Sequence, residues 1–317
     1  MPPQETVASG RAFCSIANLG AGFDAFGLAV NKYSDTVTAR LTNSKKIRIF
    51  SRGPQSKGVP SDPSKNSAGP PAISLLDKAG LKKGLEITIT KNVPQGLGLG
   101  SSGATAAACT WTLDHLLNLH LSNDELVRLA SLGEKAAAGE AHADNVAASL
   151  LGGFVIVYDN PIKTITMKPP SNLDVVVTTP QLAVRGDKTR RARKLVPRRI
   201  ETRKAVLNVG RASAIATGFA RGDIRMIGTG MNDMIAEPYR RSFIPGYDEV
   251  KRLALDAGAA GVSISGAGPS VVALVDGGSH DPRLIGRAMV QGFRHNKVSS
   301  KWFVARPARG ATIIKRR

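Results

Sequence analysis

The chain has 317 residues, 42% of them hydrophobic, which is enough apolar material for one large domain or two of ordinary size. This composition excludes an intrinsically disordered protein, and no run approaches the ~20 consecutive apolar residues of a membrane span. The net charge of +20, from 44 basic and 24 acidic residues, indicates either an anionic partner or a strongly charged solvated surface.

The N-terminus and the cysteines favour a cytoplasmic protein. Residues 1–13 lack the basic region followed by an apolar run that is typical of a secretory signal. Cys14 and Cys109, the only cysteines of the chain, form no metal-binding pattern and favour a reducing compartment. We interpret both as small buried hydrophobic residues.

Periodicity and turn residues predict the elements of the first half of the chain. Leu85, Ile87 and Ile89 alternate with polar residues, as in a half-buried strand, and Ser122 with Glu125 forms a capping box at a helix start. In chain order we expect a loop over 52–72, a helix near 72–80, a strand over 85–91, helices over 103–118, 122–138 and 142–152, and a strand over 154–158.

The second half repeats this alternation of strands and helices. We place a domain boundary near 160–170, giving domains of residues 1–165 and 166–317, in an α/β or α+β protein. The expected elements are strands at 173–178, 261–265, 270–275 and 301–305, and helices near 203–220, 223–235, 246–257 and 282–294. The densest basic cluster, at 185–204, falls in a loop, and a second basic stretch closes the chain at 306–317.

Residues 94–103, PQGLGLGSSG, form the most informative stretch. A dinucleotide fingerprint requires its glycines directly after a strand and an acid at a strand end ~20 residues on, whereas Asp124 and Glu125 lie in a helix cap. A Walker loop requires Gly-Lys-Ser/Thr, and no lysine occurs between 92 and 134. Both of these classes are therefore excluded.

A phosphate loop of another kind remains. Glycines allow backbone N–H groups to turn toward an anion, and the following helix presents its positive N-terminus to it. We expect 92–103 to be such a loop, with Ser101 and Ser102 at the helix N-terminus. A hydroxyl there can cap the helix, which we expect of at least one serine, or approach phosphate-bound Mg²⁺.

Three motifs in order resemble the GHMP small-molecule kinases. They are Ser15 to Asp24 (SIANLGAGFD), Pro94 to Ser102 (PQGLGLGSS) and Ser265 to Ser270 (SGAGPS). The resemblance implies ATP as cofactor and an α+β, two-domain fold, with an N-terminal mixed α/β domain and a C-terminal ferredoxin-like domain. It implies nucleotide contacts from Pro94, Gln95, Gly96, Leu97, Gly98, Leu99, Gly100, Ser101, Ser102, Gly103 and Ala104.

Residues 139–147, GEAHADNVA, resemble the H-A-D-N-V segment of the homoserine kinases within that superfamily. The resemblance implies that Asn145 occupies the catalytic position and that His142 contacts substrate. His142 and Asn145 share one helix face, while Asp144 should point about 100° away from Asn145. We therefore expect no carboxylate base beside the substrate hydroxyl.

Homoserine is a zwitterion with a terminal hydroxyl, so its site needs both signs of charge. Asp24 and Asn18 would serve the ammonium group and part of the polar surroundings of the hydroxyl, and the resemblance implies Arg193 and Arg240 of the second domain for the carboxylate. Arginine suits that role because its planar fork binds a carboxylate bidentately.

The resemblance also implies that Glu134 holds Mg²⁺, together with Ser101 or Ser102. The opposing interpretation is an ordinary exposed pair of Glu134 with Lys135, which needs no function.

The predicted function is ATP-dependent phosphorylation of L-homoserine in threonine biosynthesis. The expected partner is this small molecule, with neither a membrane nor a specific nucleic acid, and the assembly is a possible homodimer. One alternative is another kinase of the superfamily, acting on mevalonate, a sugar or shikimate. Another, motivated by the net charge, is a nucleic-acid-binding protein on an inactive kinase scaffold.

Overall fold

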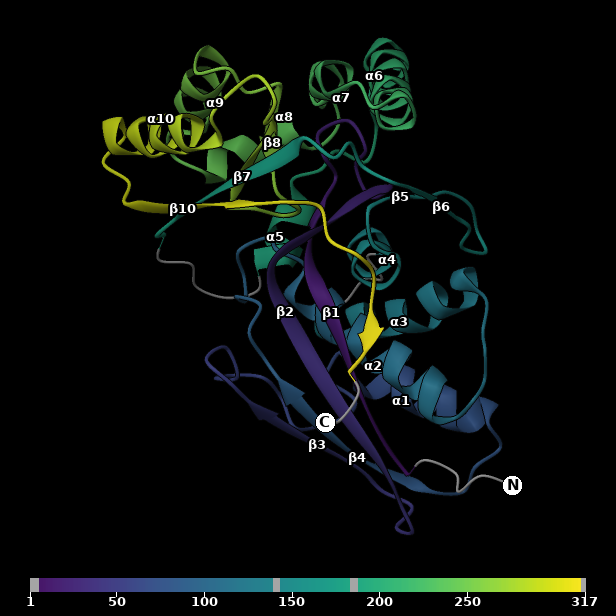
Figure 1. Cartoon of the computed structure of the whole chain (residues 1–317). Coiled ribbons are helices and arrows are strands. Elements are labelled where there is room, and N and C mark those ends of the chain that lie inside the picture. Colours follow the sequence, from purple (N-terminus) through teal and green to yellow (C-terminus); the bar gives the residue numbers. More distant parts are fainter. Residues whose placement is uncertain (1–5, 139–142, 183–187, 315–317) are drawn as a thin grey trace.

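The computed structural model describes residues 6–138, 143–182 and 188–314. Its elements form two halves, each a sheet covered by helices, stacked one above the other in Figure 1. Strands and helices segregate within each half, so the fold is α+β, as the sequence predicted.

The lower sheet carries the long N-terminal strands. Its main order is β11-β1-β2-β4-β3, and β5 pairs with β2 while β6 extends β5. Only β3 and β4 run parallel among these pairs. The strands are β1 (Val7–Ala17), β2 (Phe26–Thr42), β3 (Ile47–Arg52), β4 (Gly84–Thr90), β5 (Phe154–Val157), β6 (Thr164–Met167) and β11 (Thr312–Ile313).

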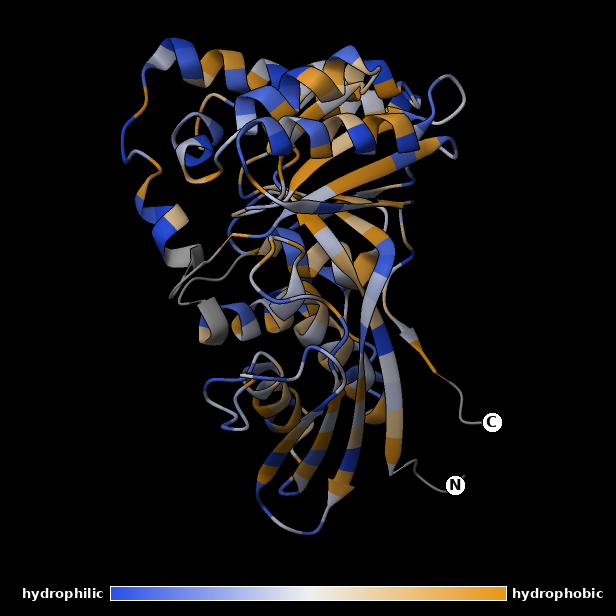
Figure 2. Cartoon of the chain, turned by 90° about the vertical axis from the view of Figure 1, so that its left-hand side faces the viewer, coloured by the Kyte–Doolittle hydropathy of each residue, from blue (hydrophilic) through white to orange (hydrophobic). Residues whose placement is uncertain are grey.

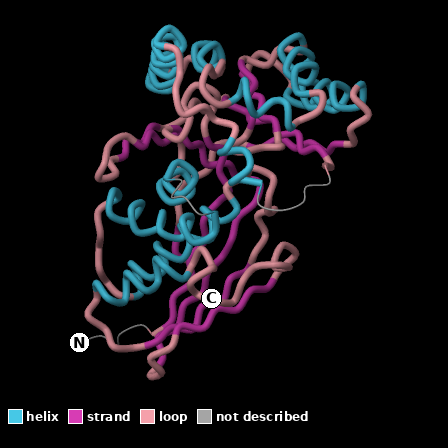
Figure 3. The backbone as a smooth tube through the Cα atoms, turned by 180° about the vertical axis from the view of Figure 1, so that it is seen from behind, coloured by secondary structure: helices cyan, strands magenta, loops and turns pink. Residues whose placement is uncertain are grey.

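Four elements predicted as helices cover one side of this sheet, as Figure 3 shows from behind. They are α1 (Gly69–Lys78), α2 (Ser101–Leu116), α3 (Asn123–Ala138) and α4 (Ala143–Leu151). The predicted cap of α3 is confirmed, because Ser122 Oγ accepts the backbone N–H of Glu125 at 3.4 Å. Helix α2 is the central one: it contacts β1, β2, α3 and α4, and its alanines pack tightly on all sides.

Helix α1 begins three residues before the predicted position of 72. Pro70 and Pro71 stand at its first positions, where a missing N–H costs nothing, so prolines that suggested a loop in fact open the helix. Helix α7 (Ile224–Gly230) ends before the predicted 235, because Asp233 accepts the N–H groups of Ile235, Ala236 and Glu237 and starts a new helix.

The upper sheet has the order β10-β7-β9-β8, with every pair antiparallel. In chain order this is 4-1-3-2, the ferredoxin-like arrangement that was predicted. Its strands are β7 (Leu173–Pro180), β8 (Gly261–Ile264), β9 (Val271–Asp276) and β10 (Ser300–Ala305). Its helices are α5 (Lys188–Lys194), α6 (Thr202–Arg221), α7, α8 (Glu237–Arg240), η1 (Arg241–Phe243), α9 (Tyr247–Asp256) and α10 (Pro282–His295).

Strands β7, β8 and β9 of the upper sheet are buried on both faces, and the sheet is accordingly largely orange in Figure 2. One face packs on α9 and α10, while Val175 and Val177 on the other join a hydrophobic core shared with the lower half. At the centre of that shared core Phe154 of β5 stacks on Phe219 of α6, with ring centroids 3.9 Å apart. A core that crosses between the sheets holds the two halves in a fixed relation.

The chain returns to the lower sheet at its end. After β10, Ala308 donates to the carbonyl of Ala29, and β11 pairs with β1. The division into domains at residue 165 stays a prediction, because residues 307–314 pack against strands of the first half although they follow the second in sequence.

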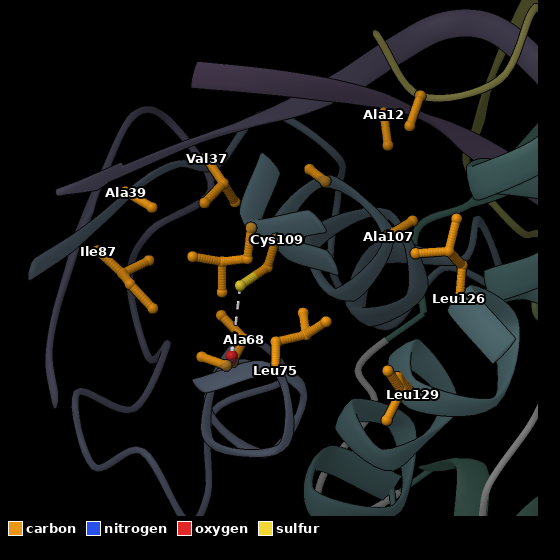
Figure 4. Packing of buried hydrophobic residues seen from close by; sticks show 14 of the residues in the cluster. Ala12, Val37, Ala39, Ala68, Leu75, Ile87, Ala107, Cys109, Leu126 and Leu129 are labelled. Atoms are coloured by element: carbon orange, nitrogen blue, oxygen red, sulfur yellow. Dashed lines mark hydrogen bonds between the residues drawn. The ribbon is translucent and has the colours of Figure 1, made fainter. Parts of the chain in front are cut away.

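Both cysteines are buried free thiols, as predicted. Cys109 lies in the core beneath α1, where its Sγ donates to the carbonyl of Ala68 at 3.4 Å (Figure 4). Burial raises the pKa of Cys14 and of Cys109 to about 12. We expect neither to react with a thiol-disulfide reagent at pH 8 in the native protein, since only the thiolate attacks, and both to react after unfolding. Rapid native-state labelling of either would contradict this.

Candidate active site

A pocket opens where the two halves meet, and most of the predicted site residues line it. Those that do are Asn18, Asp24, Pro94, Gly96, Gly98, Leu99, Gly100, Ser101, Ser102, Glu134, Asn145, Arg193 and Arg240. Gln95, Leu97, Gly103 and Ala104 do not line it. His142 lies outside the described residues.

The stretch after β4 is the loop-to-helix turn that was predicted. Gly96, Gly98 and Gly100 all have positive φ, between 62° and 73°, a conformation that favours glycine. Helix α2 starts at Ser101 directly after Gly100. A Cβ at Gly98 would lie 2.1 Å from the carbonyl oxygen of Ser265, so the loop can approach the third motif only with glycine there.

The prediction that a serine caps α2 is wrong. The N-cap is Gly100, which has no side chain with which to cap the helix. Ser101 Oγ instead donates backward to the carbonyl of Val93 at 2.8 Å, which ties the exit of the loop to its entry. The first residues of α2, Ser101 and Ser102, line the pocket, and the N-cap residue offers no side-chain acceptor to the first-turn N–H groups, which suits an anion site.

A buried ion pair beneath the loop was missed by the sequence analysis. Lys91 and Asp35 are 4% and 0% exposed, and the Lys91 ammonium donates to Asp35, to the Ser101 carbonyl and to Thr105. Burial lowers the pKa of Lys91, against the opposing effect of Asp35. The sequence did contain a signal for this pair. Lys91 falls at the next position of the alternation of Leu85, Ile87 and Ile89, whose side chains are all buried, so its side chain should be buried too.

Asp35 completes this arrangement from β2. One of its carboxylate oxygens accepts the backbone N–H groups of Asn92 and Val93, at 2.8 and 2.9 Å, and the other accepts the Thr105 hydroxyl at 2.7 Å. The carboxylate thus holds the loop entry, while Lys91 holds the start of α2. Together they fix both ends of the glycine-rich loop from below.

Asp144 lines the same pocket as Asn145 and is 2% exposed, so the expectation that it faces away is wrong. Both residues lie in the first turn of α4, whose N-terminal end opens onto the pocket, so their 100° offset around the helix axis does not separate them. Asp144 Oδ1 accepts the backbone N–H of Asn145 at 2.7 Å.

The first motif and the second half meet at the other end of the pocket. Asn18 Nδ2 donates to the Gly266 carbonyl at 3.0 Å, and Asn18 Oδ1 accepts the backbone N–H of Asp24 at 3.1 Å. Arg193 of α5 forms an ion pair with Asp24. The α5 helix falls in the stretch predicted to be a basic loop, and it places Arg193 toward the pocket.

Arg240 of α8 is 6% exposed and is held by two carbonyl groups. Its Nη1 donates to Gly266 at 3.1 Å and its Nε to Ala192 at 3.3 Å. Burial lowers its pKa, and Asp24 opposes this. The guanidinium carbons of Arg240 and Arg193 lie 4.9 and 5.2 Å from the ring centroid of Phe23. This ring supports both cations on one face of the pocket.

Glu134 of α3 is only 4% exposed and lines the pocket near the two serines, so the interpretation as an exposed surface pair is wrong. Carboxylate and hydroxyl oxygens are the hard ligands that Mg²⁺ prefers, and the set of Ser101, Ser102 and Glu134 fits that ion chemically. Within the described ranges there is no cluster of three or more His, Cys, Asp or Glu residues that could hold a metal.

Comparison with known proteins identifies the family. The profiles of the GHMP kinases N terminal domain and GHMP kinases C terminal match residues 69–153 and 215–293. A homoserine kinase of Thermoplasma acidophilum is 38% identical over 99% of this chain and 98% of its own length. One of Saccharolobus solfataricus is 38% identical over 84% and 85%.

Solved structures agree. The homoserine kinase from Cytophaga hutchinsonii has a TM-score of 0.89 at 36% identity, covering 99% of both chains. The L. major mevalonate kinase, at 16% identity, 96% coverage of both chains and a TM-score of 0.63, shares the fold. None of the helices in the described ranges is long and apolar enough to cross a membrane.

Proposed function

This chain belongs to the GHMP kinases and, within them, to the homoserine kinases, and we propose its activity from that premise. It transfers the terminal phosphoryl group of ATP to the hydroxyl of L-homoserine, yielding O-phospho-L-homoserine for threonine biosynthesis. The observation that carries this function is one pocket in which a phosphate loop lies beside paired cationic and anionic side chains.

The triphosphate binds over the loop and the N-terminus of α2. Positive-φ glycines turn backbone N–H groups inward, and the helix end attracts the anion. Ser101, Ser102 and Glu134 would hold Mg²⁺ there. When bound, that ion supplies neutralisation of charge on the phosphate oxygens.

The zwitterionic end of homoserine binds between the two halves. Asp24 and Asn18 receive the ammonium group, while Arg193 and Arg240 bind the carboxylate. Arg193 and Asp24 form an ion pair with each other. Homoserine can replace both partners, because its carboxylate has the charge of Asp24 and its ammonium group has the charge of Arg193. His142 joins this set by its place in the H-A-D-N-V segment.

Asn145 positions the substrate hydroxyl for transfer. The hydroxyl oxygen bonds to the γ-phosphorus, the bond from phosphorus to the ADP oxygen breaks, and the proton leaves on the transferred phosphate. A loose transition state places little demand on early deprotonation, so catalysis rests on in-line positioning and charge neutralisation.

Substrate choice is tested by ADP release from the purified protein with ATP and Mg²⁺, measured with homoserine, mevalonate, galactose and shikimate. We expect homoserine to give the highest kcat/KM. A higher value for one of the others would assign the chain to that substrate instead. ADP release with none of them, together with sub-micromolar and sequence-selective DNA binding, would favour the nucleic-acid alternative.

The two arginines are tested by Arg193→Ala and Arg240→Ala. Each should raise KM for homoserine about tenfold to a hundredfold, since a hydrogen bond to a charged group contributes about 1.5–3 kcal/mol, and leave KM for ATP nearly unchanged. Arg191→Ala is the matched control, because Arg191 is an exposed neighbour on α5 that packs on Phe243 and does not line the pocket. Equal damage to both KM values would show that the arginines are misplaced.

We also propose a cytoplasmic location, which suits the free thiols of Cys14 and Cys109, and a homodimer as the assembly. Sedimentation of the purified chain measures that assembly directly.

A further inference from the structure

Ser15, near the end of β1, is a fully buried hydroxyl in the first motif that has so far received no role. Its Oγ lies 3.0 Å from Oδ1 of the Asn145 side chain and 3.1 Å from the Asn145 backbone oxygen. Ser149, one turn along α4 and also fully buried, donates its hydroxyl to Ser15 Oγ at 3.2 Å. The two buried hydroxyls therefore form a chain of hydrogen bonds that runs from Ser149 through Ser15 to the Asn145 amide.

The structure orients the Asn145 amide with Oδ1 toward Ser15. An asparagine side chain has one accepting oxygen and one NH₂ group that donates, and rotation by 180° exchanges them. Ser15 accepts a hydrogen bond from the Ser149 hydroxyl and shares its own hydrogen between the backbone oxygen and Oδ1 of Asn145. With Oδ1 engaged by Ser15, the NH₂ group is the part of the amide left for the pocket that Asn145 lines.

We propose that Ser15 is a positioning residue: its hydroxyl fixes the Asn145 amide so that N–H, and not the carbonyl, meets the substrate hydroxyl. The proposal rests on the proposed function, in which Asn145 contacts that hydroxyl. An N–H donor holds the hydroxyl by one of its oxygen lone pairs and leaves its proton directed elsewhere. A flipped amide would accept that proton and hold the hydroxyl in a different direction.

Packing around Ser15 enforces the same geometry. A Cβ at Gly100 would lie 2.2 Å from Ser15 Oγ and 2.7 Å from Asn145 Oδ1, so the phosphate loop closes directly over this hydrogen bond. Ser15 also touches the loop through its backbone N–H, which donates to the Leu99 carbonyl at 3.2 Å. Ser15→Ala keeps that backbone contact and removes only the hydroxyl.

The test is a double-mutant cycle of Ser15→Ala and Asn145→Ala, with steady-state kinetics for homoserine and ATP. Ser15→Ala should lower kcat about tenfold, the effect of one neutral hydrogen bond, with both KM values within about twofold of wild type. Added to Asn145→Ala, it should lower kcat by no more than about twofold further, because it acts through the amide. Ser15→Cys, which keeps a weak donor, should give an intermediate kcat.

Ser9→Ala is the matched control: it removes a hydrogen-bonded hydroxyl from the same strand, 2.8 Å from the Thr38 hydroxyl and outside the pocket lining, and is expected within about twofold of wild-type kcat. The proposal is overturned if the losses in Ser15→Ala and Asn145→Ala multiply, if Ser15→Ala has wild-type kcat, or if Ser9→Ala loses as much as Ser15→Ala. An inactive wild-type chain would instead refute the proposed function, so the two failures are distinguishable.

Discussion

Replacing Lys91 by methionine is expected to lower the free energy of unfolding by about 3–5 kcal/mol, the typical cost of leaving one partner of a buried ion pair alone. Asp35 would keep its hydrogen bonds from the backbone and Thr105 but lose the only ammonium that the described residues bring to it. Chemical denaturation of the wild type and the variant under identical conditions measures the difference.

Arg252→Met is the control for this prediction. Arg252 pairs with Glu249 and Asp256 on the surface of α9, with more than half of its side chain exposed, and such pairs contribute about 0–1 kcal/mol. The double variant Lys91→Met/Asp35→Asn should recover part of the loss, because a neutral amide can accept the same backbone N–H groups. A loss below about 1 kcal/mol in Lys91→Met would show that the pair is solvated in solution.

The second large effect is expected at Asn145. Asn145→Ala should lower kcat about a hundredfold to a thousandfold, the range seen when one preorganised transition-state hydrogen-bond donor is removed, while KM for ATP changes little. The physical reason is orientation: without the amide, the hydroxyl of bound homoserine samples directions that are not in line with the transferring phosphate. Single-turnover rates at saturating ATP and homoserine separate this loss from binding.

Asp144→Asn is the informative companion, because Asp144 lines the same pocket from the neighbouring position of α4. If no carboxylate base is needed, kcat of this variant should keep the pH profile of the wild type. Abolished turnover with an intact fold would identify Asp144 as the base and contradict the mechanism. Melting temperatures of both variants establish whether the fold is intact.

The same fold carries different chemistry in relatives, so selectivity must lie in the lining of the pocket. The L. major mevalonate kinase shares this architecture at 16% identity. Here the pocket presents cations from the second half, Arg193 and Arg240, opposite Asp24 of the first. This pairing of charges fits a zwitterion better than a simple carboxylate or a neutral sugar.

Local patterns predicted local structure well. The alternation of Leu85, Ile87 and Ile89 marked β4, and the serine three residues before Glu125 marked the start of α3. The glycines of the phosphate loop predicted positive-φ turns leading into a helix, because few other residues adopt that conformation. In each case the cause lies within a few residues of the effect.

Contacts between distant segments could not be predicted from such patterns. The angle around an ideal helix suggested that Asp144 faces away, but the pocket lies at the end of α4, where both first-turn residues reach it. The serines suggested caps, but the bond from Ser101 to Val93 depends on how the loop folds back. Proline-rich residues before 72 suggested a loop, yet they open α1.

By itself, the sequence determined the order and type of most elements, the ferredoxin-like succession of the second half and the family, because these depend on periodicity, turn residues and short motifs. Only the tertiary structure decided that Lys91, directly after β4, pairs with Asp35 of the neighbouring strand β2 and that Ser15 contacts Asn145. The family resemblance had already assigned Arg193, Arg240 and Asp24 to one site, and the structure has all three lining one pocket. The physical reason is that these pairs are fixed by the packing of the two sheets around a shared core, which no local stretch of the chain encodes.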